Sequence, residues 1–217
     1  MNKQCLISAT WIFIIWTVIQ PQWIGAQVDN VIWSSVRLRK QVDDKLRLDI
    51  RPIMRFNNDI STYQNVSIDI SVNRKLNKGW HVQVLSRTWF LPDSPMGQFL
   101  WADVGHKTKI GQHALSNRVR LHYSFNTNEI NPADFIRLQT TITPAVKAKF
   151  RPFLSIEPWF QLDGINSFTR IRYEPGFNYP LGNDYNFTLM YRRQDSLKVE
   201  PANKQNHFVI TVTKLLR

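Results

Sequence analysis

The sequence predicts an all-β protein, and more specifically an antiparallel up-and-down transmembrane β-barrel of 10–12 strands in a single domain. Three observations predict this class. Apolar and polar residues alternate in segment after segment beyond residue 26, and the polar positions of these segments carry full charges. No apolar run after residue 26 approaches a membrane-spanning helix, and helices and closed barrels are the structures that satisfy the backbone in lipid.

The first 26 residues have the order of a secretory signal peptide. Lys3 gives a positive start, an apolar stretch covers residues 6–19, and Ala26 offers a small residue for cleavage. Pro21 closely follows the apolar stretch, which is short for a membrane span. We therefore expect a cleaved signal peptide at residues 1–26 and a barrel domain at residues 27–217, with an uncleaved N-terminal anchor as the alternative.

Cleavage would leave a basic chain without cysteine. The signal peptide contains Cys5, the single cysteine of the sequence, and its one charged residue is Lys3, so the net charge falls from +12 to +11. The mature chain then forms neither disulfides nor thiol metal sites. A basic soluble protein would suggest nucleic acid, but export argues against that partner.

The alternation is clearest in residues 45–56. Leu48 and Ile50 fall on one face of an extended chain, while Arg47, Asp49 and Arg51 fall on the other. A period of two predicts β-strands with one apolar face. The same pattern recurs in residues 65–73, 118–125, 168–179 and 206–217. Weaker candidate strands complete a series of eleven, at residues 31–40, 80–91, 99–109, 135–143, 150–162 and 184–194.

A soluble β-sandwich would alternate as well, but two observations favour the barrel. The polar faces of the candidate segments carry full charges, and the segments are 8–13 residues long, whereas strands of globular proteins are usually about 5–6 residues long. Aromatic residues lie near the ends of the segments, which is typical of the girdles that mark a membrane interface. The predicted girdle consists of Trp80, Trp89, Trp101, Tyr179 and Tyr185.

The connections between the candidate strands alternate in length. Longer ones lie around residues 57–62, 92–97, 126–134 and 196–205, which fits short periplasmic turns and longer external loops. In that arrangement the first candidate strand would run inward from the external side. Either residues 31–40 are not an ordinary strand, leaving ten, or a hidden strand gives twelve, or the barrel has eleven, an odd number that is rare in bacteria.

Several short motifs resemble a Gram-negative outer-membrane β-barrel family known only as a domain of unknown function (DUF2490 type). They are Arg118-Val119-Arg120-Leu121, Arg137, Glu157-Pro158-Trp159-Phe160, Arg170-Ile171-Arg172-Tyr173 and Tyr191-Arg192-Arg193-Gln194. The resemblance covers nearly all of the mature chain and implies a location in the bacterial outer membrane. It implies membrane lipids and the barrel insertion machinery as partners, but no assigned chemistry and no oligomeric state.

If the apolar face meets lipid, the charged face lines the lumen. The predicted lumen-lining residues are Arg47, Asp49, Arg51, Arg55, Asp69, Arg87, Arg118, Arg120, His122, Arg137, Glu157, Arg170, Arg172, Glu174 and Arg192, together with Asp103. Two interpretations remain open. The arginines and carboxylates form a structural ion-pair network, because unpaired buried charge is costly, or the excess of arginine gives a narrow, anion-leaning pore.

An outer-membrane lipid-acyl hydrolase is the alternative function. His113, Ser116, Asn117 and His122 lie close in sequence, but His113 and Ser116 have opposite parity and would point to different faces of one strand. The five histidines show no spacing of metal ligands. The sequence therefore predicts no catalytic residue, metal site or cofactor.

A surface-binding scaffold is a third possibility. It would work through the longer loops, and Lys198 and Lys204 could contact polyanionic lipopolysaccharide.

Overall fold

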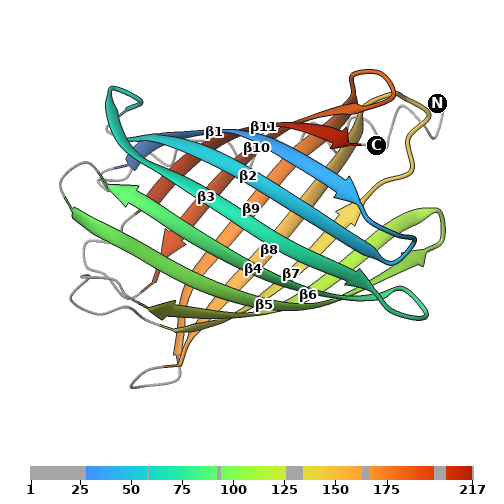
Figure 1. Ribbon diagram of the computed structural model, residues 1–217, viewed down its shortest axis with the longest axis horizontal. Coiled ribbons are helices and arrows are strands. Elements are labelled where there is room, and N and C mark those ends of the chain that lie inside the picture. Colours follow the sequence, from blue (N-terminus) through green and yellow to red (C-terminus); the bar gives the residue numbers. More distant parts are fainter. Residues whose placement is uncertain are drawn as a thin grey trace, which may run out of the picture.

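The computed structural model describes residues 28–57, 59–91, 94–125, 134–162, 167–197 and 204–216. Within these residues, eleven strands form one closed barrel (Figure 1). The strands are β1 (Val28–Gln41), β2 (Leu46–Asn57), β3 (Thr62–Lys75), β4 (Trp80–Leu91), β5 (Ser94–Ile110), β6 (His113–Phe125), β7 (Phe135–Thr143), β8 (Arg151–Gln161), β9 (Ser167–Pro180), β10 (Tyr185–Ser196) and β11 (Lys204–Leu216). No helix in the described ranges is long and apolar enough to cross a membrane. The predicted signal peptide lies outside the described residues.

The barrel is a meander that closes on itself. Each strand pairs with the next in antiparallel fashion, and β1 closes the barrel against β11 (Figure 1). The closing pair runs parallel, from Val28 opposite Lys204 to Lys40 opposite Leu216. A meander with an odd number of strands leaves its first and last strands pointing the same way. The all-β barrel is thus confirmed, and its strand number, which the sequence left at ten, eleven or twelve, is eleven among the described residues. These strands pair in antiparallel fashion except at the closing pair of β1 and β11, which we call the seam.

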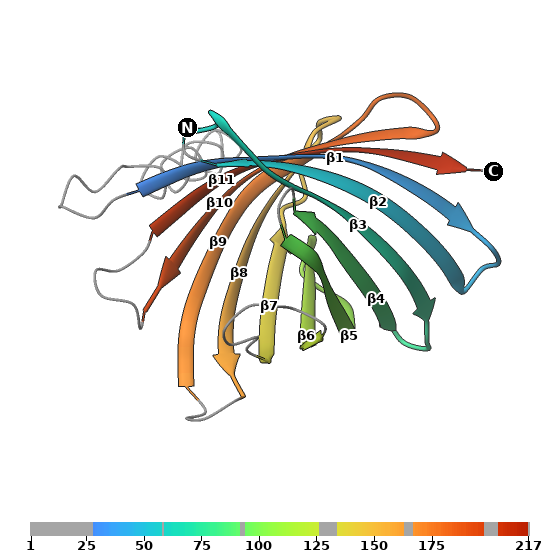
Figure 2. The same ribbon diagram turned by 60° about the vertical axis from the view of Figure 1, so that its left-hand side comes forward.

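The two ends of the barrel differ. At one end, which we call the turn end, lie the β1–β2, β3–β4, β5–β6, β7–β8 and β9–β10 connections and the end of β11 (Figure 2). Only residues 111 and 112 join β5 to β6, and Gly111 adopts a φ of 59°, which glycine tolerates without strain. The opposite end, the loop end, has the start of β1 and the other connections. Most of residues 126–134 and 196–205, predicted as long loops, lie outside the described residues.

The pleat of the strands separates the two faces. Ile50 and Ile70 point outward and are 47% and 56% exposed. Large apolar residues on the other strands that alternate in this way are exposed as well. Among the described residues, nineteen polar or charged side chains are buried against eight apolar ones. A water-soluble protein has the opposite distribution. The barrel is therefore polar inside and apolar outside.

Three of the five predicted girdle residues lie on the outer face. Trp80 begins β4 and Tyr185 begins β10, both at the turn end, and they are 47% and 43% exposed. Tyr179, at the same end of β9, has the outward parity, because its neighbour Asn178 borders the interior.

The girdle prediction was wrong for Trp89 and Trp101. Both line the interior, and Trp101 packs with Leu85 and Phe99 in a small buried apolar cluster. Trp101 lies two residues before Asp103, so the pleat sends both side chains to the same inner face.

Candidate functional site

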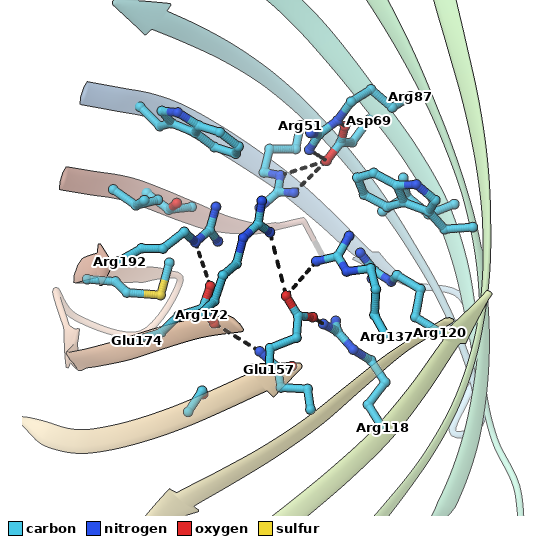
Figure 3. A pocket seen from close by; sticks show the side chains of 18 of the residues that line it. Arg51, Asp69, Arg87, Arg118, Arg120, Arg137, Glu157, Arg172, Glu174 and Arg192 are labelled. Atoms are coloured by element: carbon cyan, nitrogen blue, oxygen red, sulfur yellow. Dashed lines mark hydrogen bonds and ion pairs between the residues drawn. The ribbon is translucent and has the colours of Figure 1, made fainter. Parts of the chain in front are cut away.

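The barrel encloses a cavity of about 690 Å³ (Figure 3). The structure places all fifteen residues predicted to line the lumen along this cavity. They reach it from β2, β3, β4 and β6 to β10, because each strand turns every second side chain inward. Asp103 does not border the cavity but is buried behind it, where its exposed fraction is 3%.

Asp69 on β3 is held between two arginines from the neighbouring strands (Figure 3). Arg87 donates from Nε and Nη2 to the two carboxylate oxygens at 2.6 and 2.9 Å. Arg51 donates to Oδ2 at 2.5 and 3.2 Å. Charge-assisted, partly bidentate contacts of this kind fix both geometry and orientation, so Asp69 ties β2, β3 and β4 together from inside.

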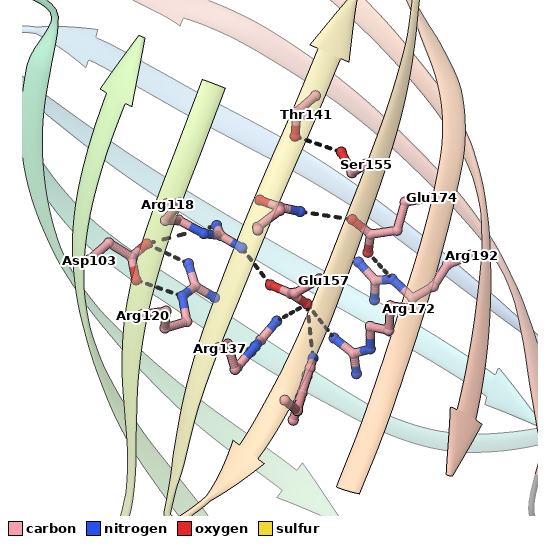
Figure 4. A network of polar contacts seen from close by, with 12 residues as sticks. Asp103, Arg118, Arg120, Arg137, Thr141, Ser155, Glu157, Arg172, Glu174 and Arg192 are labelled. Carbon is pink, nitrogen blue, oxygen red and sulfur yellow. Dashed lines mark hydrogen bonds and ion pairs between the residues drawn. The ribbon is translucent and has the colours of Figure 1, made fainter. Parts of the chain in front are cut away.

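Glu157 on β8 is the hub of a second network (Figure 4). Its carboxylate lies 2.8 Å from Arg118, 2.7 Å from Arg137 and 3.5 Å from Arg172. The indole Nε1 of Trp159 donates a further hydrogen bond at 3.1 Å. Only 1% of Glu157 is exposed, so one buried carboxylate compensates three guanidinium groups.

The ion-pair network around Glu157 continues along the inner wall on both sides (Figure 4). Arg118 also lies 3.8 Å from Asp103, which accepts two hydrogen bonds of 2.6 Å from Arg120. On the other side, Glu174 accepts from Arg192 at 2.5 Å and from Gln139 at 2.9 Å. A band of ion pairs thus lines the barrel from β5 to β10.

Guanidinium groups also lie over the faces of inward tryptophans. The centre of the Trp101 ring is 4.6 Å from the Arg87 guanidinium carbon and 4.4 Å from that of Arg120. Arg137 lies 3.9 Å from the Trp159 ring centre. The ring face attracts a cation, so the tryptophans stabilise arginines that carboxylates only partly compensate. Sequence reasoning missed this role, although the shared parity of Trp101 and Asp103 was a signal for it.

Positive charge exceeds negative charge at the cavity wall. Among the described residues, twelve arginines border the cavity against four carboxylates, and Asp103 adds a fifth carboxylate behind the wall. Two of these arginines, Arg37 and Arg39, were not predicted to line the lumen, because the polar face of residues 31–40 alternates less clearly. Arg39 pairs with Asp49 at 2.8 and 3.0 Å. The wall is therefore strongly electropositive.

The histidine and serine considered for catalysis are not brought together. His122 and Ser116 lie six residues apart on β6, which is roughly 20 Å along a strand. His113 is at the turn end, where its Nδ1 accepts the backbone N–H of Ala145 at 3.2 Å. Asn117 accepts a hydrogen bond from the Thr140 hydroxyl at 2.9 Å.

The ring of His122 is packed among aromatic side chains. Its centroid lies 5.1 Å from Phe99, 5.3 Å from Trp101 and 5.8 Å from Phe135. Neither ring nitrogen has a hydrogen-bond partner within the described part of the chain. This surrounding is that of a packed interior residue, and no group of three or more metal-ligating side chains occurs in the described ranges.

Of the two lysines considered for lipopolysaccharide contacts, Lys204 begins β11 at the loop end. Lys198 lies outside the described residues.

Comparison with known proteins gives one match. Neither the curated proteins nor the solved structures include one that matches the chain. A family model matches residues 30–205, which run from the third residue of β1 through β10 to the start of β11. The family that the arginine-rich motifs predicted is thus confirmed: the chain belongs to the family described as "Protein of unknown function (DUF2490)".

Proposed function

We propose that the mature chain is an integral β-barrel of the bacterial outer membrane whose arginine-rich lumen is a narrow, anion-leaning pore. The observation that carries this proposal is the inverted polarity of the barrel. Large apolar side chains are exposed all around the outer wall, while the charged side chains converge on the cavity inside the barrel.

The outer wall supports the membrane location. Monomeric soluble proteins rarely expose contiguous apolar patches larger than a few hundred Å². Here outward residues such as Val84, Val104 and Val119, on neighbouring strands β4, β5 and β6, are 47–52% exposed. A tilted strand of roughly 9–11 residues crosses the hydrocarbon core, and the shortest described strand, β7, has 9 residues. Closure of the barrel leaves no strand edge unpaired in lipid.

The lumen supports a narrow path rather than a wide channel. Eight-stranded barrels are just filled by their side chains, and barrels of 16–18 strands leave aqueous channels. Eleven strands leave a cavity of about 690 Å³ that arginine–carboxylate pairs partly fill. A surplus of fixed positive charge in a confined lumen favours anions over cations. Conductance is therefore expected to be small and anion-selective.

Planar-bilayer recordings of the purified mature protein test the proposal. In a potassium chloride gradient the reversal potential should show chloride permeating better than potassium. Arg37→Glu reverses a charge at the cavity wall that pairs with no described carboxylate, and it should lower the chloride preference by about twofold or more. Lys214→Glu, on the exposed outer side of the turn end, is the matched control and should leave the preference unchanged.

Two results would overturn the pore. Cation preference in the unmodified barrel would show that the arginine surplus does not govern permeation. Absence of any conductance would leave the ion pairs with a structural role alone.

A further inference from the structure

A cluster of hydrogen-bond donors lies across the parallel seam of the barrel. Arg192 on β10 is the cross-strand partner of His207 on β11, and Trp33 on β1 is the partner of Arg55 on β2. The rings of Trp33 and His207 meet edge to face across the seam, with centroids 5.4 Å apart. The guanidinium carbons of Arg55 and Arg192 lie 5.0 and 4.9 Å from the Trp33 ring centre. We call these four residues the seam cluster.

The seam cluster has polar atoms without partners. His207 is 1% exposed, and neither of its ring nitrogens has a hydrogen-bond partner among the described residues. The same holds for the buried Nε1 of Trp33 and the buried Nε of Arg55. Tryptophan and arginine can only donate hydrogen bonds, and histidine carries at least one donor. The cluster therefore presents several donors that need an acceptor.

Two carboxylates of the neighbouring strands are already engaged, and Asp29, whose charge acts on Arg55, forms no ion pair with it among the described residues. Glu174 accepts from both Arg192 and Gln139, and Asp69 accepts from Arg51 and Arg87. No described carboxylate lies within 4.0 Å of the Arg55 guanidinium, since none of the ion pairs in the described ranges includes it. Leaving buried donors unsatisfied destabilises a protein, and an uncompensated buried charge does so more. A shortage of acceptors next to a surplus of positive charge is what an anion would relieve.

We propose that the seam cluster binds a small oxyanion, a phosphate or carboxylate group, inside the lumen. Arg55 supplies a charge that forms no ion pair with a described carboxylate, and the Trp33 indole and the His207 imidazole supply further donors to the oxygens of the anion. This inference rests on the proposed anion preference of the lumen and places a specific site within it. All four residues belong to the loop-end half of their strands, so the ligand would enter from the loop end.

The test is a titration of the detergent-solubilised mature protein with inorganic phosphate, in which isothermal titration calorimetry measures the binding affinity. Arg55→Gln should weaken phosphate binding by about tenfold or more, the effect of losing one charge-assisted hydrogen bond. Arg37→Gln removes an arginine from the same cavity outside the seam cluster, and it should change the affinity less than about twofold.

Thermal unfolding separates this role from a structural one. Removal of an arginine with a structural role destabilises the barrel. Arg55 carries a buried charge without an ion pair, so Arg55→Gln should have a melting temperature at or above that of the unmodified protein. Weaker binding together with equal or higher stability is the expected combination. A marked fall in stability on Arg55→Gln would contradict the proposal.

A competition experiment identifies the source of the phosphate. Micelles doped with phosphatidylglycerol should displace inorganic phosphate if a lipid headgroup is the ligand, whereas micelles with phosphatidylcholine as the only lipid should not. Displacement of inorganic phosphate by phosphatidylglycerol identifies a lipid headgroup as the ligand, and lack of displacement identifies a free phosphate. Both outcomes fit an oxyanion site. Absence of phosphate binding, or equal weakening by Arg55→Gln and Arg37→Gln, would overturn the site. An anion-selective pore could survive that result, and a non-conducting barrel that binds phosphate would fail the pore proposal alone.

Discussion

At the scale of single residues, the interior is organised by a few carboxylates that each hold several arginines. Glu157 is the extreme case, with Arg118, Arg137 and Arg172 around it. Burial alone would disfavour all of these charges, and their mutual pairing is what makes the arrangement tolerable. Loss of such a carboxylate should therefore lower the stability of the barrel strongly, because it leaves several buried cations without a counter-charge.

Glu157→Gln should destabilise the barrel strongly, because three buried guanidinium groups lose their counter-charge. Removing one partner from a buried ion pair costs about 3–5 kcal/mol, and we expect a loss of that size in the free energy of unfolding in urea, measured in detergent. Asp195→Asn is the control, since Asp195 pairs with Arg193 at a partly exposed position on β10. The control should cost less than about 1 kcal/mol. Equal stability of the two variants would contradict the role of the hub.

The alternation predicted some of the inward-pointing residues and missed others. Parity placed Arg47, Asp49 and Arg51 on one face, and the structure places them at the cavity wall. Parity would have done the same for Trp101, but a tryptophan near a segment end was interpreted as an interfacial residue. The seam cluster could not be predicted, because the sequence left open whether residues 31–40 form a strand of the barrel and does not give the register of β1 against β11.

At the scale of strands, the seam is the feature that distinguishes this barrel from an even-numbered one. In a ten- or twelve-stranded meander the first and last strands run antiparallel, whereas here β1 and β11 are parallel with Ser35 opposite Thr211. Their hydroxyl oxygens lie 2.8 Å apart on the inner face. The pairing can therefore be captured covalently.

Ser35→Cys combined with Thr211→Cys should form a disulfide on mild oxidation. Directly paired side chains fall within the reach of a disulfide, for which the Cα atoms lie about 4.4–6.8 Å apart. Ser35→Cys combined with Thr213→Cys shifts one partner by two residues along β11 and is the matched control. Cross-linking followed by gel mobility under non-reducing conditions measures the yield. A higher yield for the shifted pair would contradict the parallel register.

Every predicted strand overlaps an observed one, but several observed strands are longer. β5 begins at Ser94 and β6 at His113, whereas the alternation began at residues 99 and 118. Near the turn end the extra residues of β6 include His113, Ser116 and Asn117, which are polar on both faces. Hydrogen bonds between β5 and β6 extend the hairpin there, beyond the region where an apolar environment would require alternation. The alternation therefore predicts the band in contact with lipid better than the full strand.

At the scale of the whole molecule, the central feature is the direction in which the two faces of the strands point. The sequence predicts two faces for each strand but not how many strands close the barrel, since its turns allow ten, eleven or twelve. Long-range pairing decides that number, and β1–β11 pairing spans almost the whole chain. In the closed barrel, the apolar face of the strands lies on the outside.

Site-directed spin labelling along β3 tests this orientation most directly. A chain that lacks the leader has no cysteine, so single nitroxide-labelled cysteines can be introduced without further change. Labels are placed at Ser67, Ile68, Ile70, Ser71, Val72 and Asn73 of the barrel in lipid vesicles. Accessibility to oxygen, which concentrates in the hydrocarbon, and to a water-soluble nickel chelate is then measured by electron paramagnetic resonance.

Accessibility should alternate along β3 with a period of two residues. Labels at positions 68, 70 and 72 should be open to oxygen and protected from the nickel chelate, and labels at positions 67, 71 and 73 should show lower oxygen accessibility. Nickel accessibility at positions 68, 70 and 72 as high as in water would contradict the account, because the apolar wall would then face solvent instead of lipid.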